Sequence, residues 1–399
     1  MLLDLTFLVS LNMSPQSIES EGNPALPRAR LATRLIFLMS GISLACWAPM
    51  VPFAKTRLGL DEAHLGMVLL AMGCGSLASM PLAGFLSHRF GNRRVIGIGA
   101  LSVCLFMPWL TLAPTAWMLA IALFCFGASH GVVDVAMNAH AVDVERMSGG
   151  GIMSGFHGLF STGGLVGSAG MSLLLAAGAP LLACAVVLAI VLAVLTVSQW
   201  KNFLEHAQAE DAKKHTIFAW PSTAVILLGV LCCISFLAEG AMLDWSAVFL
   251  RSSRQVGYDM AGLGYAAFSI AMAVGRLSGD FLVRRFGAVN MVRWGAVTAS
   301  LGFFIATCLP WAGSSLFGFL LVGIGAANIV PVLFSAAGRQ GGSAPGIAIA
   351  TVTTLGYTGM LTGPAAIGYA AHATSLPLAL SAIAVLLLGV AALAPMARR

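Results

Sequence analysis

Apolar residues run along this chain in long stretches separated by short polar segments, without the alternation of polar and apolar positions typical of strands. Each stretch has about 20 residues or more, the length that an α-helix needs to cross about 30 Å of hydrocarbon. The pattern predicts an all-α membrane protein with twelve transmembrane helices, over 31–54, 62–87, 94–113, 116–142, 151–177, 179–200, 222–250, 260–284, 289–309, 312–337, 345–371 and 374–397.

The longest polar interruption, KNFLEHAQAEDAKKHTIFAWP, covers 201–221 and divides the predicted helices into two sets of six. We therefore expect a disordered N-terminal leader (1–30), a six-helix bundle (31–200), a cytoplasmic linker (201–221) and a second six-helix bundle (222–399). The two halves are also similar in sequence: 64–91 aligns with 261–287, and the triplet RFG is in register. A duplicated six-helix unit is typical of secondary transporters, whose binding site lies near the membrane midplane.

Composition and charge placement agree with a membrane protein. Of 399 residues, 59% are hydrophobic and 9% charged, with a mean hydropathy of +0.92, whereas soluble domains have about 25% charged residues. Sixteen of the 21 Lys and Arg residues fall on the side of the predicted helices that carries both termini. The loops on the other side contain only Lys55, Arg57, Arg251 and Arg254. This asymmetry predicts cytoplasmic termini and a multi-pass protein of the bacterial inner (plasma) membrane, and it accounts for the basic charge without a nucleic-acid partner.

The eight cysteines all fall in apolar stretches and form no CxxC pair. They are typical of small buried side chains, so we expect no disulfide, no metal site and no cofactor. The glycine-rich segments 148–155 and 338–346 lack the Lys and Ser/Thr of a phosphate-binding loop and indicate hinges.

The segment GFLSHRFGNRR (84–94), between the second and third predicted helices, resembles the loop motif G-x-L-A-D-R-x-G-R-R-R of the major facilitator superfamily. A weaker second copy, DFLVRRFGA, follows at 280–288. The resemblance implies two pseudo-symmetric six-helix bundles that rock about a central site. It also implies a gate or conformational role for Gly84, His88, Arg89, Gly91, Arg93 and Arg94, with His88 standing where the family usually has Asp.

Three further segments, 153–167, 238–246 and 354–364, resemble the fucose-permease-like and YbjJ-like branch of this superfamily. The element DVAMN (134–138) is similar to the acidic-x-Ala-Ala-Asn element of fucose-permease-like proton symporters. This resemblance implies that Asp134 carries a proton and that Asn138 contacts substrate. The acid that those symporters carry in their first helix has no counterpart in 35–50.

A few ionisable residues lie inside the predicted helices, where an unpaired charge costs about 2.5–3.5 kcal/mol or more. His130, Asp134 and Asn138 are four residues apart and share one helix face. Helices four and five are expected to be neighbours, which would allow Asp134 to touch His157. The stripe is interpreted either as a proton or substrate site, with His157 as a proton-coupling and His130 as a substrate-binding residue, or as structural hydrogen bonds between helices.

The seventh predicted helix contains two acids, Glu239 and Asp244. Five residues turn about 140° around a helix, so both side chains cannot point into one narrow cavity. Both are candidate proton-coupling residues, and Glu239 is favoured because Gly240 next to it is a place where the helix can unwind. Asp244 is also compatible with a gating or structural role.

Arg276 and Asp280, four residues apart in the eighth predicted helix, suggest a local ion pair that anchors the inner gate. Neutral and aromatic side chains can complete a substrate site, and the half-repeat aligns Asn328 with Asp134. Besides His130 and Asn138, the candidate substrate-binding residues are Asn328, Trp47, Phe156 and Tyr357.

Together these features predict a secondary active transporter that moves a small polar solute, sugar-like or another neutral metabolite, by alternating access with proton symport. Its partners would be this solute, protons and the lipid bilayer, and the protein would be a monomer. Proton-coupled efflux of a drug or metabolite is the alternative, and a non-transporting receptor is a further one. The His130–Asp134–Asn138 stripe imitates an enzyme site, but no cluster of carboxylate, Cys or His residues accompanies it, so no enzyme activity is expected.

Overall fold

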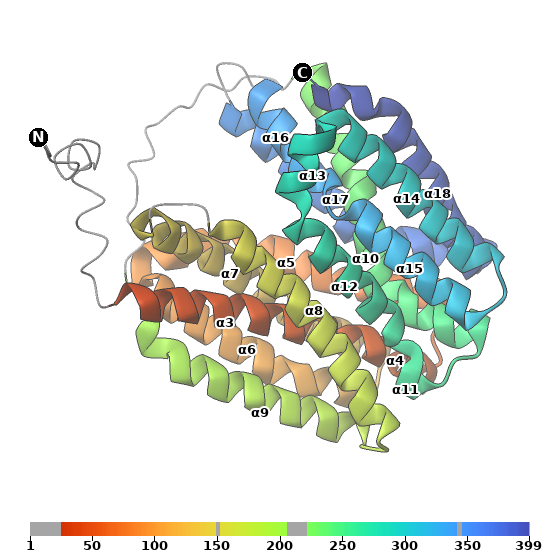
Figure 1. Ribbon diagram of the computed structural model, residues 1–399. Helices are drawn as coiled ribbons and strands as arrows, with labels where there is room; N and C mark the ends of the chain where they lie inside the picture. Colours follow the sequence, from red (N-terminus) through yellow and green to blue (C-terminus); the bar gives the residue numbers. More distant parts are fainter. Residues whose placement is uncertain (1–24, 149–151, 206–221, 341–344, 399) are drawn as a thin grey trace, which may run out of the picture.

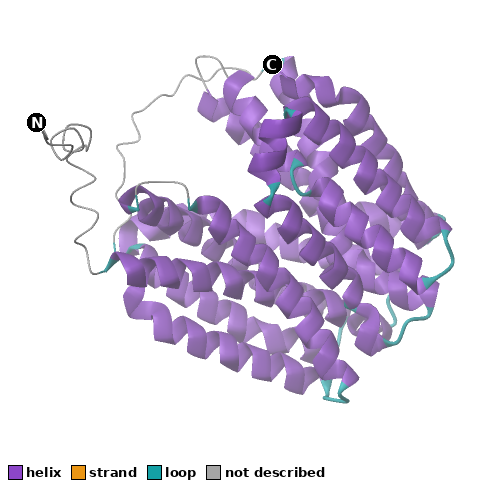
Figure 2. Cartoon of the chain, in the orientation of Figure 1, coloured by secondary structure: helices purple, strands orange, loops and turns teal. Residues whose placement is uncertain are grey.

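The structure, a computed structural model, describes residues 25–148, 152–205, 222–340 and 345–398. Every regular element in these ranges is a helix (Figure 2), which confirms the all-α prediction. Helices satisfy all backbone hydrogen bonds within one segment, as hydrocarbon requires. The expected disorder of the leader falls on 1–24, outside the described residues, and the first helix begins at Leu26, inside the range expected for the leader.

Within the described residues, the N-terminal bundle has seven helices and one 3₁₀ turn that form six transmembrane segments. The first segment is broken at Cys46 into two helices, and each of the other five is a single helix. The elements are α3 (Leu26–Ala45), α4 (Trp47–Leu58), α5 (Glu62–Phe90), α6 (Asn92–Leu112), α7 (Ala116–Met147), α8 (Met153–Ala176), α9 (Leu181–Gln199) and η1 (Trp200–Asn202).

The C-terminal bundle contains the other six segments, of which the eighth and the tenth are broken. Its elements are α10 (Thr223–Arg254), α11 (Tyr258–Ala261), α12 (Leu263–Leu277), α13 (Gly279–Phe286), α14 (Ala288–Cys308), α15 (Ala312–Ala326), α16 (Ile329–Gln340), α17 (Pro345–Ala373), α18 (Leu376–Leu393) and η2 (Ala394–Arg398). The seventh segment is one continuous helix, so the expected unwinding at Gly240 is wrong; Gly240 instead faces Met360 of α17.

Eleven helical stretches of the described chain are long and apolar enough to cross a membrane. The twelfth predicted segment, 345–371, is the helix α17, which is not among those eleven. Its sequence contains five threonines together with several glycines, which lower its hydropathy. α17 packs against α10 in its own bundle and against α5 in the other one. A helix buried between two bundles has less contact with lipid, so it needs less apolar surface.

Glycines allow the helices within a bundle to approach closely. A side chain added at Gly41 of α3 would meet the backbone oxygen of Phe160 in α8 at 2.0 Å. One added at Gly163 of α8 would meet the oxygen of Leu38 at 2.3 Å. Association of membrane helices depends on packing of this kind, because lipid provides little hydrophobic driving force between helices. α3 and α8 are thereby held against each other across the N-terminal bundle.

Both described ends of the chain, the start of α3 and the end of α18, lie toward the same side of the molecule (Figure 1). We call this the terminal side and the opposite one the far side. The bundles converge at α4 and α11 on the far side and diverge toward the terminal side (Figure 1). The helices that connect the bundles are α5 with α17 and α8 with α12, supplemented by α4 and α11 on the far side.

Candidate functional site

The seam between the bundles is closed at the far side and open toward the terminal side, as one face of α8 demonstrates. Residues 157, 161, 164 and 168 share this face at helical spacing. At the far-side end, Ser168 Oγ donates a hydrogen bond of 2.6 Å to the Gly262 oxygen across the seam, and Gly164 is buried against Ser269. At the terminal-side end, His157 is exposed.

The opposite side of the seam, between α5 and α17, is likewise closed at the far side and open toward the terminal side. A side chain at Gly66 would meet the Pro364 oxygen at 2.4 Å, and one at Gly73 would meet the side chain of Leu361 at 2.7 Å. Thr354 and Thr358 lie on the same side of α17, one to two turns closer to the terminal side, and both are exposed. The two bundles therefore leave a polar opening that ends about halfway along these helices.

An ion pair lies near the closed end of this opening. Nη2 of Arg276, at the end of α12, donates to Oε2 of Glu239 in α10 at 3.1 Å. The side chains of Arg276 and Glu239 are 26% and 12% exposed, so the pair is largely but not completely removed from solvent. Arg276 Nη1 reaches Ser161 Oγ of the N-terminal bundle at 3.5 Å, a long contact across the seam. Among the described residues, Glu239 Oε1 is buried without a hydrogen-bond partner.

This pair adds a partner that the sequence-based interpretation of Arg276 did not include, while the predicted pairing with Asp280 stays a prediction. The local partner expected four residues later, Asp280, has a described backbone but lies outside the described side chains. Among the described side chains, Arg276 bonds to an acid 37 residues away on a neighbouring helix. It is thus part of the central site rather than only of a gate at the end of its helix.

Two tyrosines surround the pair. Tyr265 lies within electrostatic range of Glu239, Arg276 and Asp244. Tyr357 of α17 stacks on Phe236 with ring centroids 5.5 Å apart, and it lies within electrostatic range of both Glu239 and Asp134. Tyr357 therefore lies within electrostatic range of one acid from each bundle.

Asp134 and Asn138 occupy the N-terminal side of the seam, on α7. Asn138 Nδ2 donates to the backbone oxygen of Asp134 at 2.8 Å and to its Oδ1 at 3.2 Å. The predicted pairing of these two residues on one helix face is therefore present. The position of Asp134 near Tyr357 keeps it as a candidate proton carrier.

The expected contact between Asp134 and His157 is not formed. α8 packs mainly on α3 and α12, whereas α7 packs on α5 and α6, so the fourth and fifth segments touch only slightly. The His157 ring contacts Phe37 edge-on at 5.3 Å and lies within electrostatic range of Arg276. His157 belongs to the opening, but on the side of the Glu239–Arg276 pair.

Asp244 is 3% exposed, and its Oδ1 has no hydrogen-bond partner among the described residues. It lies on α10 five residues farther toward the far side than Glu239 and within electrostatic range of Tyr265. Of the two acids on α10, Glu239 is the one that pairs with Arg276.

Four candidate substrate-binding residues are packed between helices instead of lining the opening. His130 Nε2 lies 3.2 Å from Ser43 Oγ, and Asn328 Nδ2 donates to the Gly275 oxygen at 2.9 Å. Phe156 stacks on Phe37 at 5.6 Å, and Trp47 is 1% exposed at the break between α3 and α4. These side chains pack between helices in this structure, and a substrate-binding role for them stays a prediction.

The 84–94 motif lies on the terminal side, where α5 ends and α6 begins. Arg93 donates to the backbone oxygens of Phe203 and Lys201 and to Glu205 Oε1, at 2.8, 2.9 and 2.6 Å. Gly91 adopts φ +83, and a side chain there would meet the Glu205 oxygen at 2.3 Å. The motif thus holds the start of the linker, whose remainder, 206–221, lies outside the described residues.

The other motif residues make fewer contacts. Arg89 and Arg94 are exposed, with Arg89 over the Phe90 ring at 5.5 Å, and a side chain at Gly84 would meet open space. The side chain of His88 lies outside the described residues. A gate role for these four positions stays a prediction.

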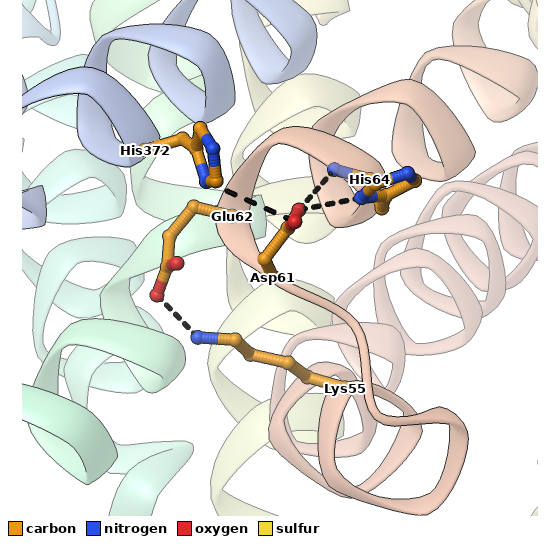
Figure 3. A network of polar contacts seen from close by, with 5 residues as sticks. All are labelled: Lys55, Asp61, Glu62, His64 and His372. Carbon is orange, nitrogen blue, oxygen red and sulfur yellow. Dashed lines mark hydrogen bonds and ion pairs between the residues drawn. The ribbon is translucent and has the colours of Figure 1, made fainter.

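A second polar cluster lies on the far side, where α4, α5 and α17 meet (Figure 3). Lys55 pairs with Glu62, and Asp61 accepts from the backbone N–H of His64 and contacts its ring, each at 2.8 Å. His372 of the other bundle lies 3.8 Å from Asp61. Hydrogen bonds from His64 hold the pKa of the Asp61 carboxyl below its ordinary value of 3.8. These contacts reinforce the closed far side.

Comparison with known proteins identifies the family. The model of the Major Facilitator Superfamily matches residues 35–364. The chain belongs to this superfamily. An uncharacterized MFS-type transporter of Yersinia pestis is 45% identical over 363 residues, covering 91% of this chain and 94% of that protein. Relatives of this kind agree with the prediction that the chain is a transporter and not an enzyme.

Solved structures share the fold of this transporter. A mutant form of the nucleoside transporter NupG aligns with a TM-score of 0.72 at 13% identity, covering 92% of this chain and 98% of that one. A D-xylose–proton symporter aligns with a TM-score of 0.66 at 17% identity, covering 90% and 96%. The predicted major facilitator fold, with two six-helix bundles, is confirmed.

Sequence reasoning missed Ser161 and Tyr265 in the site of this transporter. Tyr265 precedes Arg276 by eleven residues, which is about three helical turns, and Ser161 follows His157 by four, so each shares a face with a candidate residue. Helical periodicity around the ionisable residues is therefore the signal that points to them. In the described part of the chain, no group of three or more His, Cys, Asp or Glu residues is arranged to hold a metal ion.

Proposed function

We propose that this transporter moves a small neutral polar solute together with protons across a bacterial inner membrane, with both termini in the cytoplasm. The observation that carries the proposal is the Glu239–Arg276 pair beside Ser161 of the other bundle, near the closed end of a polar opening. An acid at this depth is energetically costly, so it is expected to be paired or to have a function. A proton on Glu239 would weaken its bond to Arg276, and solute hydroxyls would then compete for the guanidinium.

Asp134 acts, in this proposal, on the other side of the solute. Its neighbour Asn138 supplies an amide, and Tyr357 supplies a hydroxyl within electrostatic range of both acids. The resemblance of 134–138 to fucose-permease-like symporters and the names of the two structural neighbours, a nucleoside transporter and a D-xylose–proton symporter, support a hydroxylated solute. We therefore expect a sugar or nucleoside.

The asymmetry of the seam supports alternating access. The state described here is open toward the terminal side, and the excess of Lys and Arg on that side supports placing it in the cytoplasm. Rocking of the bundles would separate α5 from α17 and α8 from α12 on the far side, and would bring Thr354 and His157 toward the opposite bundle. Solute and proton would be released to one side and loaded from the other.

The test begins with purified protein and a thermal-shift screen of sugars, nucleosides, amino acids and drugs. The solute that stabilises the protein is then supplied to proteoliposomes containing a pH-sensitive dye. Solute-driven alkalinisation of the outside supports symport. Acidification would instead indicate an antiporter and favour efflux, and binding without flux would indicate a receptor.

Residue roles are tested with Asp134→Asn in the same vesicles. We expect proton-driven uptake to be lost while solute exchange partly survives, because exchange does not require net proton movement. Asp259→Asn, which removes the same group at the far-side start of the eighth segment, serves as the matched control. Unchanged proton-driven uptake in Asp134→Asn would remove this residue from coupling.

A further inference from the structure

A cavity of about 440 Å³ lies at the far end of the seam, outside the closed part of the pathway. One wall comes from α4 of the N-terminal bundle, with Lys55 and Thr56, and the other from the end of α10 and from α11, with Arg251, Gln255 and Tyr258. Thr56 Oγ1 and the Tyr258 hydroxyl lie 2.8 Å apart and connect the two walls. The cavity is therefore formed jointly by both bundles.

The cavity is lined by two cations and by no acid. Far-side loops carry only four Lys and Arg residues, and three of them have structural partners. Arg57 donates to the Leu110 oxygen, Arg254 donates to Ser315 and to backbone oxygens of 306, 307 and 309, and Lys55 pairs with Glu62 (Figure 3).

Arg251 is the fourth, and it is held differently. Its guanidinium lies over the Tyr258 ring, 4.3 Å from the centroid. Its Nε is buried and, within the described chain, has no hydrogen-bond partner. A buried donor without a partner is costly, which indicates that a group from outside the chain completes the site.

Stabilisation of the end of α10 does not account for Arg251. A cation in the last turn of a helix is favoured by the helix dipole, but Arg254 already supplies one there. The end of α10 is also capped by its own backbone, because Gln255 adopts φ 55 and the Val256 N–H donates to the Leu250 oxygen at 3.1 Å. The Nε–H of Arg251 therefore remains available for a group from outside the described chain.

We propose that this far-side cavity binds an anionic group, a carboxylate or a phosphate, through Arg251. A planar guanidinium matches these groups with two parallel hydrogen bonds, and stacking on Tyr258 fixes its orientation. Gln255 and Thr56 provide further polar contacts. Because both bundles form the walls, the bound anion stabilises the state that is closed on the far side. It would act as an inhibitor from that side that does not compete with the transported solute.

Binding is measured on the full-length protein in nanodiscs of phosphatidylcholine, with inorganic phosphate and benzoate as probes in calorimetric titrations. Arg251→Gln should weaken binding at least about tenfold, since it removes a charge-assisted bidentate contact. Arg284→Gln, which removes an exposed charge from the terminal side, is the matched control and should bind as the parent does. Melting temperatures of all three proteins show whether each variant is folded.

A second comparison identifies the source of the anion. If phosphatidylglycerol in the nanodisc blocks binding of both probes to the parent protein, a lipid headgroup is the occupant. If binding is unchanged by that lipid, the occupant is a soluble anion, and both results support the site. Equal affinities of the parent and a folded Arg251→Gln protein, or no saturable binding of either probe to the parent, would overturn the proposal. The measurement needs no transport, so it is independent of the proposed function.

Discussion

Replacing Arg276 with Met should destabilise the protein more than replacing both members of the pair. Arg276→Met leaves the Glu239 carboxylate in a largely buried position, where its Oε1 already lacks a partner. Removing one partner from a buried ion pair costs about 3–5 kcal/mol, whereas replacing both by apolar or neutral groups is often nearly neutral. The residual exposure of both side chains reduces the expected cost to about 2–3 kcal/mol.

Proton binding by Glu239 sets an upper limit to the loss of stability in Arg276→Met. A stranded carboxylate can take up a proton, and for a glutamate of ordinary pKa near 4.3 this costs about 3.7 kcal/mol at pH 7. The loss in Arg276→Met therefore cannot exceed this value by much, and it should shrink by as much as about 1.4 kcal/mol for each unit by which the pH is lowered. The double variant Glu239→Gln/Arg276→Met should show little of this pH dependence.

The assay is equilibrium unfolding in mixed micelles with increasing SDS, followed by circular dichroism at neutral and mildly acidic pH. The parent, both single variants and the double variant form a double-mutant cycle, for which we expect a coupling energy of about 1–2 kcal/mol. A coupling energy near zero, or an Arg276→Met deficit that is the same at both pH values, would refute the view that Arg276 compensates a buried charge.

Three further perturbations test other parts of the structure. Gly163→Val should destabilise the α3–α8 contact by about 1–3 kcal/mol in the same assay, since its side chain would meet backbone at 2.3 Å. Arg93→Gln should release the start of the linker and speed its proteolysis by about fivefold; an unchanged cleavage rate contradicts this. Because the pKa of Asp61 is lowered, its carboxylate stabilises the folded protein above pH 3.8, and this contribution is lost as the pH falls further. The melting temperatures of Asp61→Asn and the parent should therefore become equal only below that pH.

The order of apolar and polar segments determined the fold of this protein without reference to any tertiary contact. A stretch of about 20 apolar residues in hydrocarbon can satisfy its backbone only as a helix, so length and hydropathy suffice to predict segments such as 179–200 and 374–397. The half-repeat predicted two bundles, because similar sequences form similar units. Breaks at Cys46 and at Ala327–Asn328 were not readable, because both occur inside continuous apolar sequence and depend on what packs beside them.

For the site, the sequence determined which residues are exceptional, and the tertiary structure decided which of them meet. Glu239, Arg276 and Asp134 stand out because charge is expensive inside a membrane helix. Local spacing suggested Asp280 as a partner of Arg276, and it could not show that Glu239 of another helix also pairs with this guanidinium. His130 shares a face with Asp134 yet is buried against Ser43. Periodicity fixes the direction of a side chain from its own helix, whereas its surroundings come from helices that are distant in sequence.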